Sequence, residues 1–263
     1  MQGKRALVLA LVLAPISAIF VTAGARLGST RPDSPARQER GDVADTPVVD
    51  FDAPETADPK ERALRRARSK AYDYAGGGAD AKMFAIKETS EPIVLDLPVS
   101  DGPKEPSLPV RQADAVVIGK ITDARAYLSN DRTSVYSEFT TLLEDVLLDG
   151  QSASLFAGAT IPTQRYGGVV RFPSGKTVVR GALGRTMPRV GARYLLFLRK
   201  DEAGQAFSII TGYALINGKV MPLDGVSKKL PQLAQFAAHE NADEAAFIEQ
   251  VRAAIAGEGR HNR

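Results

Sequence analysis

The sequence predicts a mainly β fold built around a small closed barrel. Residues 114–124 are rich in β-branched side chains, and residues 135–149 alternate their side chains between two faces, so both read as long strands. Between residues 159 and 223 follow shorter β-like segments that glycine and proline separate. An amphipathic segment near the C-terminus predicts a helix that packs on the strands.

The N-terminus has the features of an export signal. Residues 6–25 carry no charge and follow Lys4 and Arg5. A basic start and an apolar core are typical of a signal peptide, but a run of ~20 apolar residues also spans a bilayer. Residues 1–25 are therefore predicted to be a signal peptide or a membrane anchor, with a buried soluble helix as a third interpretation. Because basic residues beside such a segment stay on the cytoplasmic side, the rest of the chain is predicted to be extracytoplasmic. It would be anchored to the membrane if the segment is kept, and periplasmic or secreted if the segment is cleaved.

Residues 26–57 combine several prolines with many acidic residues and few large apolar ones. Such a composition buries too little surface to offset the entropy of ordering, which predicts a disordered linker. Asp58 and Pro59 then favour a helix start. Residues 58–82 are expected to form a short basic helix, running to about Tyr74, and a glycine-rich connection. Its basic faces indicate either contact with anionic lipid or an acidic partner, or a solvated helix.

The barrel is assigned to residues 83–225. Residues 128–133 are polar and predict a turn between the two long strands. Pro162 places the next strand at an edge or a bulge. Residues 169–172 and 177–180 read as a hairpin, and the apolar run 194–198 reads as a central strand.

Asn217 and Gly218 tolerate the positive φ angles of a type I′ turn, which predicts a hairpin between residues 207–216 and 219–223. Residues 226–256 then turn helical, with a short helix over 230–238 and a longer one over 245–256. The longer helix begins after a capping box and carries an apolar stripe that includes Phe247 and Val251. Residues 257–263 are expected to be a tail.

Two segments carry a resemblance to a known family. Residues 113–121 (ADAVVIGKI), followed by Tyr136 and Phe139, and residues 191–198 (GARYLLFL) resemble the OB-type barrel of netrin-like and tissue-inhibitor-of-metalloproteinase-like domains. The layout also resembles that of exported bacterial proteins. The resemblance implies a closed OB-like barrel over about residues 110–223. The animal inhibitors act through an N-terminal cysteine, and this chain contains no cysteine, so no functional residue carries over.

The sequence offers few groups for catalysis. Without cysteine there is no disulfide framework, thiol nucleophile or cysteine metal site. His239 and His261 lie outside the barrel and are predicted to be surface residues, so a Ser-His-Asp system or multi-histidine zinc site has no source. A Ser–Lys pair or the carboxylates of Glu144 and Asp145 remain formal options that no spacing supports. We predict a protein that is not an enzyme and needs no cofactor or metal.

Charge is distributed unevenly. The net charge is only +3, yet residues 150–200 contain no Asp or Glu. The predicted polyanion-binding face in this stretch comprises Arg165, Arg171, Lys176, Arg180, Arg185 and Arg189. Three interpretations stay open: a solvated face paired with the acidic residues of 123–149, a surface for an anionic or protein partner, or a nucleic-acid surface.

The function predicted from these features is a non-catalytic, exported or membrane-tethered binding domain. Its partner would be a protein, a glycan or an envelope component, with the membrane added if the N-terminal segment is uncleaved. One alternative is binding of nucleic acid or another polyanion by residues 165–200, which export from the cytoplasm disfavours. The other is an enzyme with an unrecognised site.

Overall fold

The computed structural model divides the chain into two units, residues 1–34 and 35–263. Described residues all belong to the second unit; they are 45–74, 84–89, 94–97, 106–150, 155–182, 184–201, 206–225 and 234–261. The predicted signal or anchor over 1–25, the linker as far as residue 44 and the glycine-rich connection lie outside them. Among the described residues, no helix has both the length and the hydropathy that crossing a bilayer requires.

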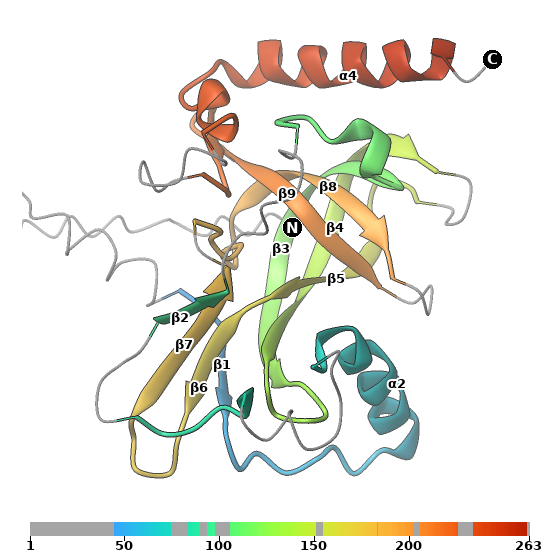
Figure 1. The fold of residues 1–263 in the computed structure, drawn as a ribbon. Coiled ribbons are helices and arrows are strands. Elements are labelled where there is room, and N and C mark those ends of the chain that lie inside the picture. The colour runs from blue at the N-terminus through green and yellow to red at the C-terminus, as the bar shows by residue number, and fades with distance from the viewer. Residues whose placement is uncertain are drawn as a thin grey trace, which may run out of the picture. The chain divides into compact units, whose positions relative to one another are not determined.

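A six-stranded sheet forms the larger part of the fold, which confirms the prediction of a mainly β protein (Figure 1). Its strands are β3 (Ala115–Leu128), β4 (Val135–Asp149), β5 (Thr160–Tyr166), β8 (Arg193–Lys200), β9 (Phe207–Ile216) and β10 (Lys219–Pro222). The order is β10-β9-β5-β4-β3-β8, and β8 also pairs with β9. The β5–β9 pair is parallel, whereas the other pairs are antiparallel.

Several local predictions for this sheet are confirmed. The run 194–198 lies in β8, which has neighbours on both sides. Asn217 and Gly218 have φ angles of 51° and 74° and connect β9 to β10, as a type I′ turn requires. The prediction that Pro162 places its strand at an edge or a bulge is wrong, because β5 lies between β4 and β9 and pairs with β4 without a bulge. Pro162 pairs with Thr140 of β4, while the pairing of β5 with β9 begins only at Thr163, so the residue that lacks an N–H lies just outside the second ladder.

A smaller sheet has the order β1-β6-β7-β2. Its strands are β1 (Val48–Asp50), β6 (Gly168–Arg171), β7 (Thr177–Ala182) and β2 (Val94–Leu97), and the predicted β6–β7 hairpin is confirmed. Strand β1 corrects the prediction of a disordered linker as far as residue 57. It pairs in parallel with β6, and the Phe51 ring beyond it stacks on Phe172 with 4.9 Å between centroids. A short apolar segment thus becomes ordered by pairing with a strand that is distant in the sequence, which amino-acid composition does not predict.

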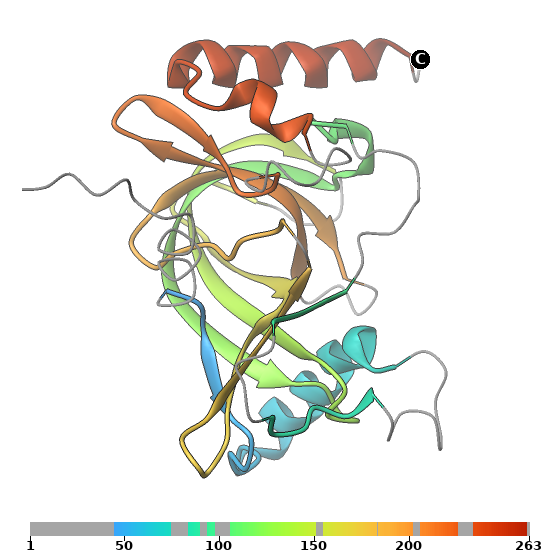
Figure 2. The ribbon, with the colours of Figure 1, turned by 60° about the vertical axis from the view of Figure 1, so that its left-hand side comes forward.

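Helices lie at opposite ends of the six-stranded sheet, with α4 at one end and α2 at the other (Figures 1 and 2). The helical elements are α2 (Pro59–Ser69), η1 (Lys70–Tyr72), η2 (Val110–Gln112), η4 (Phe236–His239) and α4 (Glu244–His261). Helix α2 is shorter than predicted, because the chain tightens into the 3-10 turn η1 after Ser69. Of the predicted short helix over 230–238, the described part is the 3-10 turn η4.

Strand β3 buries both of its faces. Val117 and Ile121 join one core cluster with Phe139 of β4. Val116 joins a second cluster, which includes Phe247 and other residues of α4. The predicted packing of a C-terminal helix on the strands is therefore confirmed. A third cluster joins the ends of β3 and β4 to the smaller sheet.

Candidate anion-binding pocket

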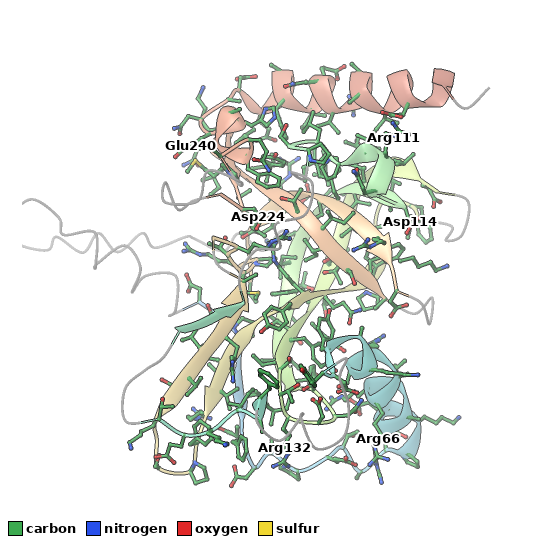
Figure 3. All side chains as sticks on the ribbon, viewed as in Figure 1. Arg66, Arg111, Asp114, Arg132, Asp224 and Glu240 are labelled. Atoms are coloured by element: carbon green, nitrogen blue, oxygen red, sulfur yellow. The ribbon has the colours of Figure 1, made fainter. Side chains whose placement is uncertain are left out.

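A pocket of about 520 Å³ lies between α2, residues 48–56 and the β3–β4 hairpin. Its basic lining residues are Arg62, Arg65, Arg66, Arg125 and Arg132. We call this cavity the arginine pocket. Two carboxylates, Asp50 and Glu55, also line it, together with Tyr127 and Tyr136. In Figure 3, the labels of Arg66 and Arg132 mark the end of the unit where the pocket lies.

Helix α2 presents three of these arginines because of its spacing. Positions 62, 65, 66 and 69 recur every three or four residues and so share one helical face, and all four line the pocket. The helix begins where expected: Asp58 caps it by accepting a hydrogen bond from the Lys60 N–H at 2.9 Å, and Pro59 occupies the first turn. The predicted helix start is thus confirmed.

The β3–β4 turn fastens α2 in place. The Asn130 backbone N–H donates to Ser69 Oγ at 2.7 Å, and the Asn130 side chain donates to the Arg66 carbonyl at 3.1 Å. Asp131 accepts from the backbone N–H of Tyr74 at 2.7 Å and from that of Thr133 at 3.0 Å. The short polar side chains that predicted a turn therefore also bind the helix that carries the arginines.

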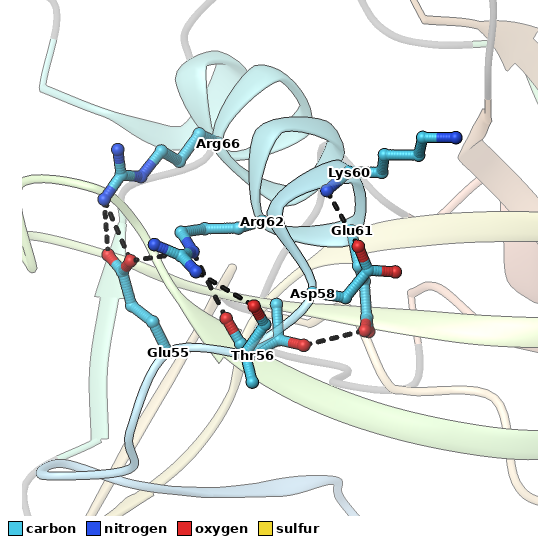
Figure 4. Close-up of polar contacts among 8 residues, drawn as sticks. Glu55, Thr56, Asp58, Lys60, Glu61, Arg62 and Arg66 are labelled. Carbon is cyan, nitrogen blue, oxygen red and sulfur yellow. Dashed lines mark hydrogen bonds and ion pairs between the residues drawn. The ribbon is translucent and has the colours of Figure 1, made fainter.

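Arg62 and Arg66 are held by the segment that precedes the helix (Figure 4). Arg66 donates to both oxygens of Glu55, each at 2.9 Å. Arg62 donates to the carbonyl of Thr56 at 3.2 Å and lies 3.7 Å from Glu55 Oε2. The two guanidinium groups therefore share one carboxylate, which fixes their positions but neutralises only one positive charge.

Aromatic rings form another part of the lining. The Arg65 guanidinium lies over the Tyr127 ring, 4.3 Å from its centroid, and pairs with Glu61. Tyr127 packs against Tyr136, which stacks on Tyr72 of η1 with 4.6 Å between centroids. Burial raises the pKa of all three tyrosines, so they stay protonated at neutral pH and add no negative charge to the pocket.

The remaining two arginines come from the hairpin. Arg125 is paired with Asp123 at 3.1 Å. Arg132 has a φ of 57°, a conformation that is uncommon for residues other than glycine, and its guanidinium lies 5.1 Å from the Phe51 ring centroid. Within the described part of the chain, Arg132 forms no ion pair with a carboxylate. Its N–H donors therefore remain available to a ligand.

The six residues of the predicted polyanion-binding face do not form one exposed surface. Arg165 is only 4% exposed and pairs with Asp224, which is fully buried between the labelled ends of the unit (Figure 3). Arg180 is half-buried, and that burial lowers its pKa. Arg185 is also partly buried and donates to the Ile210 carbonyl at 3.2 Å.

The other three residues of that face are exposed, but each meets a carboxylate from an N-terminal segment. Arg171 pairs with Asp50 at 2.6 Å, Lys176 with Glu88 at 3.2 Å, and Arg189 with Asp45 at 3.1 Å. Their charge is therefore largely compensated within the fold. The expected pairing with acidic residues of 123–149 is seen for Arg193, which pairs with Glu144.

The groups considered for catalysis lie apart. Glu144 pairs with Arg193 and Asp145 with Arg252, so neither carboxylate faces the other as an acid–base pair. His239 is half-buried against Tyr213 and Phe247, and its Nε2 lies 3.1 Å from Ser107 Oγ, which corrects the prediction of a surface residue. Over the described residues, no three His, Asp or Glu side chains are grouped so that they could hold a metal ion. The side chain of His261 lies outside the description.

The sequence contained one signal for the arginine pocket, the basic face of the helix after Asp58. Arg125 and Arg132 carried no comparable signal, because they reach the pocket from a hairpin far along the chain from α2. No protein-family model matches the chain, and neither does any curated protein. The site therefore rests on its geometry alone.

Proposed function

We propose that this protein is a non-catalytic binding domain whose site is the arginine pocket, and that its ligand is anionic. The observation that carries this proposal is the convergence of five arginines, from α2 and the β3–β4 hairpin, on one cavity of about 520 Å³. That volume falls within the range of ~300–1,000 Å³ typical of small-molecule sites. Guanidinium groups recognise carboxylates and phosphates through parallel N–H donors, which suits them to this role.

The chemistry of the lining supports binding rather than catalysis. Guanidinium groups keep their protons at any physiological pH, and the two lining tyrosines have raised pKa values. Such groups hold charge in place but do not exchange protons near neutral pH, as general acid–base catalysis needs. The pocket is thus better suited to retaining an anion than to transforming it.

The fold proposed for this domain is a small closed barrel of OB type, similar to netrin-like domains. The pairings β3–β4, β4–β5, β5–β9, β9–β8 and β8–β3 support it, since they return to the strand at which they start. In OB-folds the surface of the second and third strands binds oligonucleotides. Here Tyr72 of η1 stacks on Tyr136 of β4, on the corresponding surface, which favours a small anion over nucleic acid.

We also propose that the domain acts outside the cytoplasm, exported or tethered to a membrane by residues 1–25. The support is the uncharged run over 6–25 behind Lys4 and Arg5. An envelope component that carries a negative charge would then be available to the arginine pocket. This part of the proposal rests on the sequence.

Isothermal titration calorimetry of the full-length chain tests the binding function. The titrants are benzoate, phenyl sulfate and phenyl phosphate at constant ionic strength, because each joins one anionic group to a small ring. We expect at least one to bind, and Arg125→Gln to weaken that binding several-fold through loss of a charged hydrogen-bond donor. Arg252→Gln, which removes another exposed, ion-paired arginine from α4, is the matched control and should leave binding unchanged. Absence of binding by all three titrants, or wild-type binding by Arg125→Gln, would refute the proposal.

A further inference from the structure

The charge balance of the arginine pocket indicates how many negative charges its ligand carries. The carboxylates that pair with the five arginines are Glu55, Glu61 and Asp123. Asp50 lines the pocket but pairs with Arg171, outside it. Five guanidinium groups thus share three carboxylates in ion-pair contact, so two of their positive charges have no paired carboxylate of their own among the described residues. A single carboxylate or sulfate ester would neutralise only one of them.

The arrangement of the two excess charges is also informative. One belongs to Arg132, whose guanidinium contacts the Phe51 ring and no described carboxylate. The other is shared by Arg62 and Arg66, which are locked around Glu55. Because Glu55 already holds Arg62 and Arg66, these two side chains lose less entropy when a ligand binds. A group with several acceptor oxygens, such as phosphate, can accept more than one hydrogen bond from guanidinium groups that line the same pocket.

Part of the remaining lining is apolar or aromatic. Val48 is 48% exposed, and Tyr127 and Leu128 are partly exposed, so these three residues offer apolar surface to a ligand. The cavity of about 520 Å³ is much larger than an inorganic anion needs. An anion alone would leave this surface in contact with water, whereas an attached apolar or aromatic body would cover it.

From these three observations we propose that the arginine pocket binds an organic phosphate monoester. The dianionic head meets Arg132 and the Arg62–Arg66 pair, and the organic body lies against Tyr127 and the neighbouring apolar side chains. A phosphate monoester carries about −1.5 to −2 charges at pH 7, which matches the two uncompensated arginines. This inference rests on the proposed function, which requires only that the pocket binds some anion.

The first test compares phenyl phosphate with phenyl sulfate by calorimetry on the full-length chain at pH 7.5. We expect phenyl phosphate to bind at least about tenfold more tightly, which corresponds to one extra charged hydrogen bond. Lowering the pH to 5.5 should weaken phenyl phosphate, whose second ionisation has a pKa of about 6, but not phenyl sulfate. Equal affinities, or the same pH dependence for both titrants, would overturn the inference and leave the binding function standing. If benzoate bound most tightly of the three titrants, the inference would also be overturned and the binding function would stand.

The second test uses Arg132. Arg132→Gln should weaken phenyl phosphate about tenfold, whereas the control Arg252→Gln should bind like the wild type. If Arg132→Gln does not fold, Arg132→Lys is measured in its place. This variant keeps the positive charge but loses the planar set of N–H donors, so it should bind phenyl phosphate with intermediate affinity. Wild-type affinity in whichever of the two variants folds would overturn the inference.

The third test identifies the source of the phosphate. Vesicles of phosphatidylcholine with and without phosphatidic acid, whose head is a phosphate monoester, are mixed with the full-length chain and floated. Retention that requires phosphatidic acid and is lost in Arg132→Gln indicates a lipid head group. Binding of phenyl phosphate without such retention indicates a soluble ester. Both results support the inference, and failure of both probes to bind would contradict it.

Discussion

Replacing Asp224 by alanine removes one half of an ion pair that lies in the interior of the fold. Arg165 of β5 is 4% exposed and Asp224 is 0% exposed, so water cannot take the place of the missing carboxylate. Removing one partner of a buried pair typically costs ~3–5 kcal/mol, because the other charge is left desolvated and uncompensated. For a folded unit of this size, that corresponds to a decrease in Tm of about 6–20 °C.

A second variant separates the value of the pair from the cost of breaking it. Arg165→Met combined with Asp224→Leu replaces both charges by apolar side chains. Asp224 Oδ2 has no hydrogen-bond partner among the described residues, so the native pair itself bears a desolvation cost. We therefore expect the double variant to recover most of the stability that Asp224→Ala loses.

Unfolding in urea, followed by circular dichroism, measures both effects. Urea is preferred to guanidinium chloride because it does not screen charges. If Asp224→Ala cost less than ~1 kcal/mol, the pair would behave like an exposed salt bridge, and the assignment of Arg165 to the interior would be wrong. If the double variant were as unstable as the single one, the loss would instead come from packing.

Three further predictions concern the attachments of the helices. Asp131→Ala should cost about 2 kcal/mol and speed hydrogen exchange in α2, because four hydrogen bonds to this carboxylate are lost. Burial raises the pKa of the Asp131 carboxyl, but these hydrogen bonds lower it by more, so its pKa in the folded protein lies below the ordinary 3.8. The stability that this carboxylate contributes should therefore be complete above that pH and be lost as the pH falls below it. An unchanged pH profile of stability in Asp131→Asn would contradict this. Phe247→Ala should cost ~3–5 kcal/mol in urea unfolding, because the ring fills the contact between α4 and the strands; a loss under ~1 kcal/mol would show that α4 packs loosely. Burial lowers the pKa of His239, so the stability that its neutral form contributes should be complete above the ordinary 6.5 and fall below it. His239→Gln should remove this loss between pH 7 and pH 5, and an identical loss in the variant would exclude His239 as its source.

Local patterns determined most of the strands in the described residues. Alternation and β-branching placed β3 and β4, the continuous apolar run placed β8, and Asn217 with Gly218 placed the β9–β10 turn. These features act over a few residues, through backbone preference and side-chain periodicity. The stripe through Phe247 likewise identified the C-terminal helix and the side that packs.

Contacts between distant segments could not be predicted from the sequence. Strand β1 forms only because β6 offers it a parallel partner, although its composition indicated a disordered linker. The arginines of the predicted basic face also lie in different places in the fold. Arg165 pairs with Asp224 in the interior, and Arg189 pairs with Asp45 at the surface. A run of one charge along the chain gives no information about which opposite charges folding brings beside it.

The mainly β fold, the positions of the long strands and the basic face of α2 could be predicted from local patterns, because each depends on neighbours a few residues away. The place where the charge acts could not, because it depends on contacts between distant segments. Arg125 and Arg132 join Arg65 in one pocket because the β3–β4 turn binds α2 through Asn130, and the chain beyond η1, at Tyr74, through Asp131. Ion pairs and pockets depend on distance in space, which sequence separation does not specify.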